Sequence, residues 1–428
     1  MIEEIVKKIE NKQPVGKQLI FAVIEQYTSG NLSDEQFLPF IKAVYDYDIS
    51  NQDLFYLTDA MMHSGEVLEL SMLGGVVDKH STGGVSDTTT LIIAPICAFL
   101  GVKMLKMSGR ALGFTGGTCD KLECFTGYKT DIDLSQAITL TKQNGACMIT
   151  STANIAPADK KIYALRDRTG YVDSIPLIAS SIMSKKLASG ADSIVLDVKY
   201  GNGAFMPNKT MAKKLAKKMI ALGRLAGKKI KVVYGKMNQP LGNNIGPRLE
   251  AFEAVQVLKG KKGNLYKDSV KLASHCVALE KKIPYFFAKK LVKNAIKSQN
   301  ALKKLQILIS SQSGSFELFS QELPQPTLKV LSNSNGKMHY VNTKELGEVV
   351  ADLVKDCGLD YSKQNFVGIK TNFKNGDKVK KGDCLFEIYS RTKSQAQDLL
   401  PDLSKCYELR WNKNTKNSLF HKNKILIM

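Results

Sequence analysis

Two stretches of the chain combine glycines, hydroxyl side chains and a lysine, which are the residue types that proteins use to bind an anion. They are VDKHSTGGVSDTTT (77–90) and KMSGRALGFTGGTCDKLE (106–123). Glycines let backbone N–H groups approach an anion closely, and hydroxyls donate further hydrogen bonds. Lys79 and Lys106 add positive charge. Either stretch alone is equally well explained as a tight turn, but the two together favour a phosphate cage.

Two further segments have hydrogen-bond donors at helical spacing, which places each pair on one face of a helix. Such pairs can hold a planar ring that bears oxygen atoms, although each alone is better explained as an exposed helix face. His80 adjoins the first glycine-rich stretch, and its reference pKa of ~6.5 suits proton transfer. The four other histidines have no such context, and we interpret them as structural. The two pairs are Tyr163 with Arg166, and Ser181 with Lys185.

Several familiar motifs are absent from the sequence. It has no GxxxxGK[ST] phosphate loop, no HExxH, no GxSxG and no kinase signature. GNGAF, which begins at Gly201, has only two of the three glycines of a dinucleotide-binding fingerprint. The two glycine-rich stretches therefore remain the strongest indication of a binding site.

The elements that must position these residues follow from periodicity and capping signals. Residues 1 to about 65 read as helices, with start signals at Ser33 and Ser50. Beyond them, strands alternate with helices, which indicates a mostly parallel α/β sheet. We expect strands at 102–108, 146–149, 193–201 and 229–235, and helices at 135–144 and 209–226.

Changes in residue pattern and in the expected secondary structure along the chain predict its domain organisation. The fold class is α/β, with a small all-helical domain, a large mixed α/β domain and a β-rich C-terminal lobe. The expected divisions are a helical domain at 1–65 to which 158–190 return, a phosphate-binding α/β domain at 66–157 and 191–330, and an α+β lobe at 331–428. Within the lobe, we expect short strands around turns at Gly376-Asp377 and Gly382-Asp383.

Composition excludes several classes of protein. The 428 residues are 43% hydrophobic, enough for a large core. The longest apolar run, residues 91–102, is shorter than the ~20 residues of a spanning helix, and Pro95 interrupts it. The eight cysteines form no CxxC pair, so we expect free thiols and a cytoplasmic location.

The formal net charge of +21 raises the possibility of nucleic-acid binding. The lysines, however, occur as dispersed pairs without a block of five or six and without interleaved aromatic residues. Solvated faces explain this pattern better, and we expect neither a nucleic-acid nor a membrane partner. A basic balance still favours small anionic substrates such as phosphate.

Taken together, these segments resemble the pyrimidine nucleoside phosphorylase and thymidine phosphorylase family. The second stretch resembles its signature SGRxLGxTGGTxDKLE, and DKHSTGGV, YALRD and SIPLIASSIMSKK resemble further blocks in the same order. LDVKYGNGAFM, QPLGNNIG and NGDKVKKGD also fit, so the resemblance covers nearly the whole chain. It implies reversible phosphorolysis of uridine, thymidine and deoxyuridine to the free base and an α-pentose 1-phosphate, without an organic cofactor.

The resemblance also implies three groups of site residues and an assembly. We expect a homodimer packed through the helical domain, and domain closure on hinges near 65–75, Ser151 and Ser189. Protonated His80, Arg166 and Lys185 would stabilise the departing base. The phosphate ligands would be Lys79, Ser81, Thr90, Ser108 and Thr118, with Lys106 adding charge. The base pocket would comprise His80, Tyr163, Arg166, Ser181 and Lys185. A monovalent cation, potassium, would be held by Ser86, Thr88, Leu241, Asn244 and Glu253, in several cases through backbone carbonyls.

Two positions depart from the family pattern. Ser86 stands where the family usually has glycine, and Phe114 stands where it often has histidine. Phe114 removes a possible polar contact near the base, which predicts an altered base preference. Lys106 resembles uridine-accepting members, whereas strict thymidine phosphorylases tend to have an apolar residue there. This favours the broad pyrimidine nucleoside enzyme, with a strict thymidine phosphorylase as the alternative.

Two rival interpretations come from other classes of protein. An anthranilate-type phosphoribosyltransferase would share the helical-plus-α/β plan and a glycine-rich loop, but neither loop has an acidic pair beside it that suits magnesium. A carrier module is suggested by GDKVKKGDCLFEI, which resembles the turns of biotinyl and lipoyl domains. That segment lacks the exposed lysine and the flanking residues that such a module needs at its hairpin tip.

Overall fold

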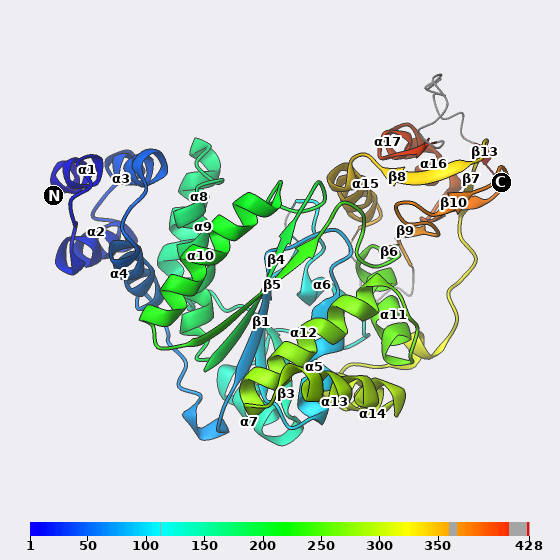
Figure 1. Ribbon diagram of the computed structural model, residues 1–428, viewed down its shortest axis with the longest axis horizontal. Helices are drawn as coiled ribbons and strands as arrows, with labels where there is room; N and C mark the ends of the chain where they lie inside the picture. Colours follow the sequence, from blue (N-terminus) through cyan, green and yellow to red (C-terminus); the bar gives the residue numbers. More distant parts are fainter. Residues whose placement is uncertain (112, 359–365, 411–425, 428) are drawn as a thin grey trace.

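The computed structural model describes residues 1–111, 113–358, 366–410 and 426–427. Figure 1 shows three regions side by side: helices at the N-terminal end, a central sheet covered by helices, and a C-terminal lobe. The helical, α/β and β-rich textures expected from the sequence are all present, and the mixed α/β fold is confirmed.

The N-terminal region is built only from helices. The capping signals at its helix starts are confirmed, since Ser33 and Gln36 form a reciprocal capping box and Ser50 accepts a hydrogen bond from the Asp53 amide at 3.0 Å. Three later helices pack here, where α4 contacts α9, α2 contacts α8, and α10 lies between α9 and two strands of the central sheet. Its helices are α1 (Ile2–Glu10), α2 (Lys17–Ser29), α3 (Asp34–Tyr47), α4 (Asn51–Met62), α8 (Pro157–Thr169), α9 (Ile175–Ala188) and α10 (Lys209–Leu225).

The central sheet is parallel. One group of strands has the order β1-β4-β5, a second group pairs β2 with β3, and a parallel bridge between Val76 and Lys103 brings the two groups together. Because the carboxyl ends of parallel strands share one edge, the segments after β1, β2 and β3 meet there. The strands are β1 (Val77–Ser81), β2 (Met104–Ser108), β3 (Ala146–Thr150), β4 (Ser193–Tyr200) and β5 (Lys229–Lys236).

Helices cover the sheet, and the apolar run of residues 91–102 lies at the centre of their core. It forms most of α5, whose residues from Thr89 to Ala98 are all buried. Within the described ranges, none of the helices combines the length and the apolar character required to cross a bilayer. The covering helices are α5 (Thr89–Phe99), α6 (Thr118–Leu122), α7 (Leu134–Asn144), α11 (Pro247–Leu258), α12 (Asn264–Lys281), α13 (Tyr285–Lys297) and α14 (Asn300–Ser311), with short 3₁₀ turns η1 (Ser71–Leu73) and η2 (Glu317–Ser320).

The C-terminal lobe contains two antiparallel sheets and three helices. It starts at Leu328, before the expected boundary at 331, and it borrows β6 from the middle of the chain as an edge strand beside β9. The expected turns at Gly376 and Gly382 precede β10 and β11. Its elements are β6 (Asn244–Ile245), β7 (Leu328–Leu331), β8 (Gly336–Tyr340), β9 (Gly368–Thr371), β10 (Lys378–Val379), β11 (Cys384–Tyr389), β12 (Tyr407–Arg410), β13 (Leu426–Ile427), α15 (Thr343–Asp356), α16 (Lys393–Asp398) and α17 (Leu400–Lys405).

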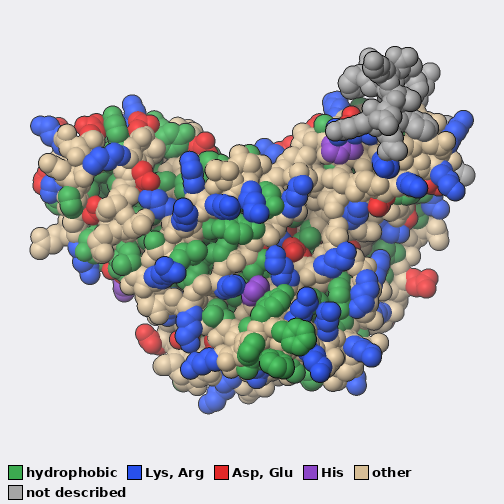
Figure 2. Space-filling model, viewed as in Figure 1, with side chains coloured by type: hydrophobic (Ala, Val, Ile, Leu, Met, Phe, Trp, Pro, Cys, Tyr) green, Lys and Arg blue, Asp and Glu red, His purple; other side chains and the backbone are tan. Residues whose placement is uncertain are grey.

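Positive charge is dispersed over the surface of the protein. Lysine and arginine side chains spread over the face in Figure 2 without gathering into one stripe, and the outline is hollowed between the helical region and the C-terminal lobe. All eight cysteines are free thiols, and all except Cys384 are buried.

Candidate active site

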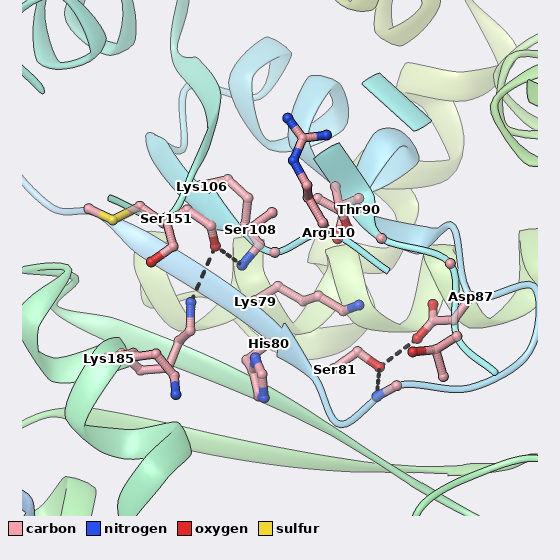
Figure 3. A pocket seen from close by; sticks show the side chains of 18 of the residues that line it. Lys79, His80, Ser81, Asp87, Thr90, Lys106, Ser108, Arg110, Ser151 and Lys185 are labelled. Carbon is pink, nitrogen blue, oxygen red and sulfur yellow. Dashed lines mark hydrogen bonds between the residues drawn. The ribbon is translucent and has the colours of Figure 1, made fainter. Parts of the chain in front are cut away.

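A cavity of about 280 Å³ lies at the carboxyl edge of the sheet, and both glycine-rich stretches line it. Lys185 and Lys186 of α9 contribute from the helical region, and Ser151 follows β3 into the lining. Figure 3 shows Lys185 and Ser151 around one space with side chains of both glycine-rich stretches. All six residues expected on the phosphate side line this cavity, namely Lys79, Ser81, Thr90, Lys106, Ser108 and Thr118. Of the expected base pocket, His80 and Lys185 line it as well.

β1 divides the cavity because successive residues of a strand point to opposite faces. Lys79 and Ser81 lie toward the first glycine-rich stretch, where the Ser81 hydroxyl donates to Asp87. Asp78 and His80 lie on the other face, toward β2 and α9. One short strand thus supplies both the anion-binding half of the cavity and its opposite half.

Lys79 is held firmly in the anion-binding half. It is only 2% exposed, and its Nζ donates to Thr89 Oγ1 at 2.7 Å and lies 3.6 Å from Asp197 Oδ2. Burial raises the pKa of Asp87, but the ammonium groups of Lys79 and Lys199 outweigh that effect and hold this pKa well below its usual range. Asp87 is therefore ionised and accepts the hydrogen bond of the Ser81 hydroxyl, so Ser81 can donate to a phosphate only by exchanging that partner.

Other hydroxyls are better placed to receive an anion. The Ser108 side chain is buried, and its Oγ has no hydrogen-bond partner among the described residues. Thr90 lies in the first turn of α5, where the helix dipole adds positive potential. An unsatisfied buried hydroxyl costs about 1–3 kcal/mol, so a ligand that accepts from Ser108 gains that amount.

A buried ion cluster forms the floor of the other half. Asp78 lies 3.1 Å from Lys106 Nζ and 2.9 Å from Lys186 Nζ, and these two ammonium groups outweigh burial and hold the pKa of Asp78 well below its usual range. Burial, reinforced by Lys186, lowers the pKa of Lys106 to about 7 despite the attraction of Asp78. Near neutral pH, therefore, the charge of Lys106 is set by what binds beside it.

The expectation of a protonated His80 needs correction. Burial lowers the pKa of His80 well below its ordinary value, and the positive charges of Lys186 and Lys106 lower it further. His80 is neutral at physiological pH in this structure. It can still donate one ring N–H to a ligand, but it supplies no positive charge.

The expected base pocket is only partly assembled. Lys185 bonds to Asp159 and donates to Ser181 Oγ at 3.1 Å, so Ser181 lies just behind the lining. Tyr163 and Arg166 are absent from the lining of the cavity. The Arg166 guanidinium is buried, and it donates to the backbone carbonyls of Tyr171 at 3.1 Å, Val172 at 2.7 Å and Leu177 at 3.4 Å. In this conformation Arg166 fastens α8 to the chain that follows it, and a spacing rule within one helix could not reveal these partners.

The two departures from the family pattern have different consequences. Ser86 adopts φ +60°, a left-handed conformation that glycine adopts most easily. Phe114 is expected near the base, where it would remove a polar contact, but it does not line the cavity. The residue is 6% exposed, the centroid of its ring lies 5.0 Å from that of Phe205, and its backbone lies against Gly347 of α15. Phe114 therefore joins the second glycine-rich stretch to the C-terminal lobe.

The positions expected to hold a cation lie together behind the first glycine-rich stretch. The Ser86 hydroxyl donates to the Asn244 carbonyl at 2.5 Å, and the Glu253 carboxylate accepts from the Asn244 amide at 2.8 Å. The Leu241 amide donates to the Val85 carbonyl at 3.1 Å. Thr88 Oγ1 is buried and has no partner within the part of the chain that the structure describes. A buried hydroxyl without a partner two residues from Ser86, together with the Glu253 carboxylate and the carbonyls of this loop, provides oxygen atoms of the kind that a hard cation prefers.

Sequence reasoning missed three charged residues that shape the cavity. Asp78 and Lys186 build the ion cluster, and Asp87 holds Ser81. The alternation of β1 could have placed Asp78 on the face of His80, because these residues are two apart in a strand. No comparable signal links Asp78 to Lys186, which comes from α9.

Comparisons with known proteins define first the class of the chain. A family model described as "Glycosyl transferase family, a/b domain" matches residues 73–306, and one described as "Pyrimidine nucleoside phosphorylase C-terminal domain" matches residues 338–410. The chain is thus an enzyme of the glycosyltransferase class, with a sheet edge that presents the cavity described above.

Full-length relatives narrow the class to one family. The chain is 40% identical to the pyrimidine-nucleoside phosphorylase of Staphylococcus haemolyticus over 99% of both chains. It is 41% identical to that of Bacillus subtilis over 91% of this chain and 92% of the relative. The protein belongs to the pyrimidine-nucleoside phosphorylase family.

A solved structure shows how widely this fold is shared. Anthranilate phosphoribosyltransferase from Thermus thermophilus matches with a TM-score of 0.60 over 72% of this chain and 99% of that chain, at 19% identity. At that identity the likeness shows the fold alone. The rival interpretation from the sequence therefore shares the architecture, while the full-length relatives belong to the phosphorylases.

Proposed function

We propose that the protein catalyses the reversible phosphorolysis of uridine, thymidine and deoxyuridine, and that it yields the free base and an α-pentose 1-phosphate. One observation above all supports this function. All six expected phosphate-side residues line one cavity in a chain whose full-length relatives are named pyrimidine-nucleoside phosphorylases. The unpartnered Ser108 hydroxyl in that cavity provides a donor for the phosphate.

In the proposed reaction, a phosphate oxygen forms a bond to C1′ of the pentose while the bond from C1′ to the base nitrogen breaks. The electron pair of the broken bond leaves with the base, and the configuration at C1′ inverts. Lys79, Thr90, Ser108 and Thr118 would hold the phosphate in line, which lowers the barrier by positioning. No covalent enzyme intermediate is needed.

The base side would stabilise the anion that leaves. Lys185 already lines the cavity, and neutral His80 can donate a hydrogen bond to a carbonyl oxygen of the ring. Arg166 would add positive charge if closure of the helical region exchanged its backbone carbonyls for the base. These groups accelerate the reaction only as far as they bind the base anion better than the neutral nucleoside.

We extend the proposal to a monovalent cation, potassium, held by Ser86, Thr88, Leu241, Asn244 and Glu253. When bound, such a cation would supply positive charge that stabilises the fold of the loop behind the phosphate half. The Thr88 hydroxyl, which is buried without a partner among the described residues, and the Glu253 carboxylate, which accepts from the Asn244 amide, support this assignment. A melting temperature that stays the same when potassium chloride replaces choline chloride would contradict it.

We also propose a cytoplasmic homodimer that packs through the helical region. Tyr45, Tyr47 and Val172 leave more than a third of their surface exposed on that region, as expected of apolar groups that a partner covers. Light scattering on the purified protein should give twice the mass of the chain.

A side-by-side assay tests the function. The purified protein should release uracil from uridine and thymine from thymidine only when phosphate is present, together with a pentose 1-phosphate. The rival transferase is tested by replacing nucleoside and phosphate with phosphoribosyl pyrophosphate, anthranilate and magnesium, because that enzyme would join the phosphoribosyl group to the acceptor and release pyrophosphate. Release of base without phosphate, or no release at all, would refute the proposed function.

The variant Lys79→Met makes the same assay specific to the cavity. It removes a charge-assisted contact worth roughly 1.5–3 kcal/mol, which predicts a tenfold or greater rise in the KM for phosphate. It should also lower the melting temperature, because Asp87 and Asp197 would then share Lys199 alone. Lys290→Met, an exposed lysine on α13, is the matched control and should change neither quantity.

A further inference from the structure

The C-terminal lobe forms hydrogen bonds with a loop that lies behind the phosphate half of the cavity. This loop, residues 238–245, ends in β6, which pairs with β9 of the lobe. The Thr371 amide donates to the Asn243 carbonyl at 2.7 Å, and the Asn375 side chain donates to the Asn238 carbonyl at 2.7 Å. The loop is therefore fixed to the lobe at both of its ends.

Lys374 fixes the middle of the same loop. It lies between β9 and β10, and its Nζ donates to the carbonyl of Pro240 at 2.8 Å and to that of Gly242 at 2.6 Å. Burial lowers the pKa of Lys374 to about 8, while Glu253 and Asp377 oppose that change. An ammonium group between two carbonyls is a strong hydrogen-bond donor that brings both carbonyls toward one point.

The far side of the loop touches the segment that carries the phosphate-binding residues. The Leu241 amide donates to the Val85 carbonyl at 3.1 Å, and the Gly242 amide donates to the Ser86 carbonyl at 3.3 Å. The next residue, Asp87, lines the cavity and accepts the Ser81 hydroxyl. A continuous series of hydrogen bonds and peptide bonds thus connects the lobe to the cavity.

We infer that Lys374, a residue of the C-terminal lobe, is a positioning residue for phosphate binding. Its ammonium sets the conformation of residues 240–242, and these hold residues 85 and 86, so that the segment from Asp87 to Thr90 keeps its place in the phosphate half of the cavity. The inference rests on the function proposed above. It assigns the C-terminal lobe a task in the reaction although none of the described residues of the lobe lines the cavity.

A purely structural lysine would give a different pattern. If Lys374 only attached the lobe, its loss would lower the melting temperature and disturb both substrates alike. If it positions the phosphate half, its loss should act selectively on phosphate, because residues 241 and 242 bond to residues 85 and 86, whereas His80 and Lys185 on the base side are carried by β1 and α9.

The test is a graded series measured under saturating potassium: Lys374→Arg, Lys374→Gln and Lys374→Met, with Lys378→Met on β10 as the control for an exposed lysine of the lobe. Lys374→Arg keeps two donors and should retain the phosphate KM within about threefold. Lys374→Gln keeps one donor and should be intermediate. Lys374→Met should raise the phosphate KM about tenfold and leave the uridine KM within about twofold, since ~1.4 kcal/mol corresponds to tenfold. The control should match the wild type.

Three outcomes decide the matter. A selective, graded rise in the phosphate KM supports the inference. An unchanged phosphate KM in Lys374→Met, or an equal rise for phosphate and uridine, overturns it while the wild-type enzyme still shows phosphorolysis. If the wild type itself shows no phosphorolysis, the proposed function fails instead. If Lys374→Met does not fold, the phosphate KM of Lys374→Gln is compared with that of Lys374→Arg instead, and the same criteria apply.

Discussion

At the scale of single residues, charge is set by neighbours more than by residue type. Lys106 and His80 stand among basic groups in a buried place, and both lose affinity for their protons as a result. Asp78 stays ionised in the same place because it has two ammonium partners. The base half of the cavity therefore carries less positive charge than a count of its basic side chains would predict.

This gives a prediction for Lys106. In Lys106→Met, we expect the ratio of kcat/KM for thymidine to that for uridine to rise about tenfold, as the loss of one charge-assisted hydrogen bond would cause. The measurement is the pair of specificity constants in one buffer. An unchanged ratio would show that Lys106 does not select between the bases.

The pH dependence of the same variant has a definite sign. The pKa of Lys106 is about 7 in the folded protein, so its ammonium is present below that pH and is lost above it. Wild-type kcat/KM for phosphate should therefore decline relative to Lys106→Met as the pH rises through 7. Parallel profiles for the two proteins would contradict this assignment.

At the scale of elements, the second glycine-rich stretch lines the cavity and also connects it to the C-terminal lobe. Its Gly116 and Thr118 line the cavity, whereas Phe114 packs between Phe205 and α15. The same short loop thus contacts both the ligand space and the C-terminal lobe. Its glycines permit that path, and the Phe114 side chain anchors it to the lobe.

Phe114→His tests this arrangement. Because Phe114 does not line the cavity, the thymidine-to-uridine ratio should stay within about twofold of the wild type. Burial of an imidazole in its place should lower the free energy of unfolding by about 1–3 kcal/mol. Urea unfolding measures the stability, and Phe114→Leu, which stays apolar, is the control. A large change in the thymidine-to-uridine ratio would contradict this placement and would indicate that Phe114 contacts the base.

At the scale of the whole molecule, the helical region and the sheet meet through segments that touch one another. The Glu66 amide donates to the Asn154 carbonyl at 2.9 Å, and the Leu68 amide donates to the Ala188 carbonyl at 2.8 Å. These contacts involve the segments expected as hinges. With Arg166 held by backbone carbonyls and absent from the cavity lining, closure about these segments is the movement that would complete the base pocket.

Closure predicts a change of overall size. The radius of gyration from small-angle X-ray scattering should fall when phosphate and uracil are added together, because the two lining regions approach each other. Phosphate alone should give a smaller decrease, since it occupies only one half of the cavity. An unchanged radius with both ligands would contradict closure. Chloride at equal ionic strength is the control.

The sequence by itself determined the features that depend on neighbouring residues. Apolar periodicity and capping predicted α7 and α10 and the strands β2, β3, β4 and β5 at nearly their observed ends, because these signals act within a few residues. The glycine-rich stretches likewise indicated an anion site from composition alone, and parallel strands bring the ends of β1 and β2 to one edge.

Only the tertiary structure decided which charges meet. Lys374 and Pro240 are 134 positions apart, and Asp78 and Lys186 come from a strand and a distant helix. The protonation of His80 and the engagement of Arg166 depend on burial and on charges a few ångströms away, and electrostatic energies change steeply with both. Such distances arise from packing, so no local pattern in the sequence could fix them.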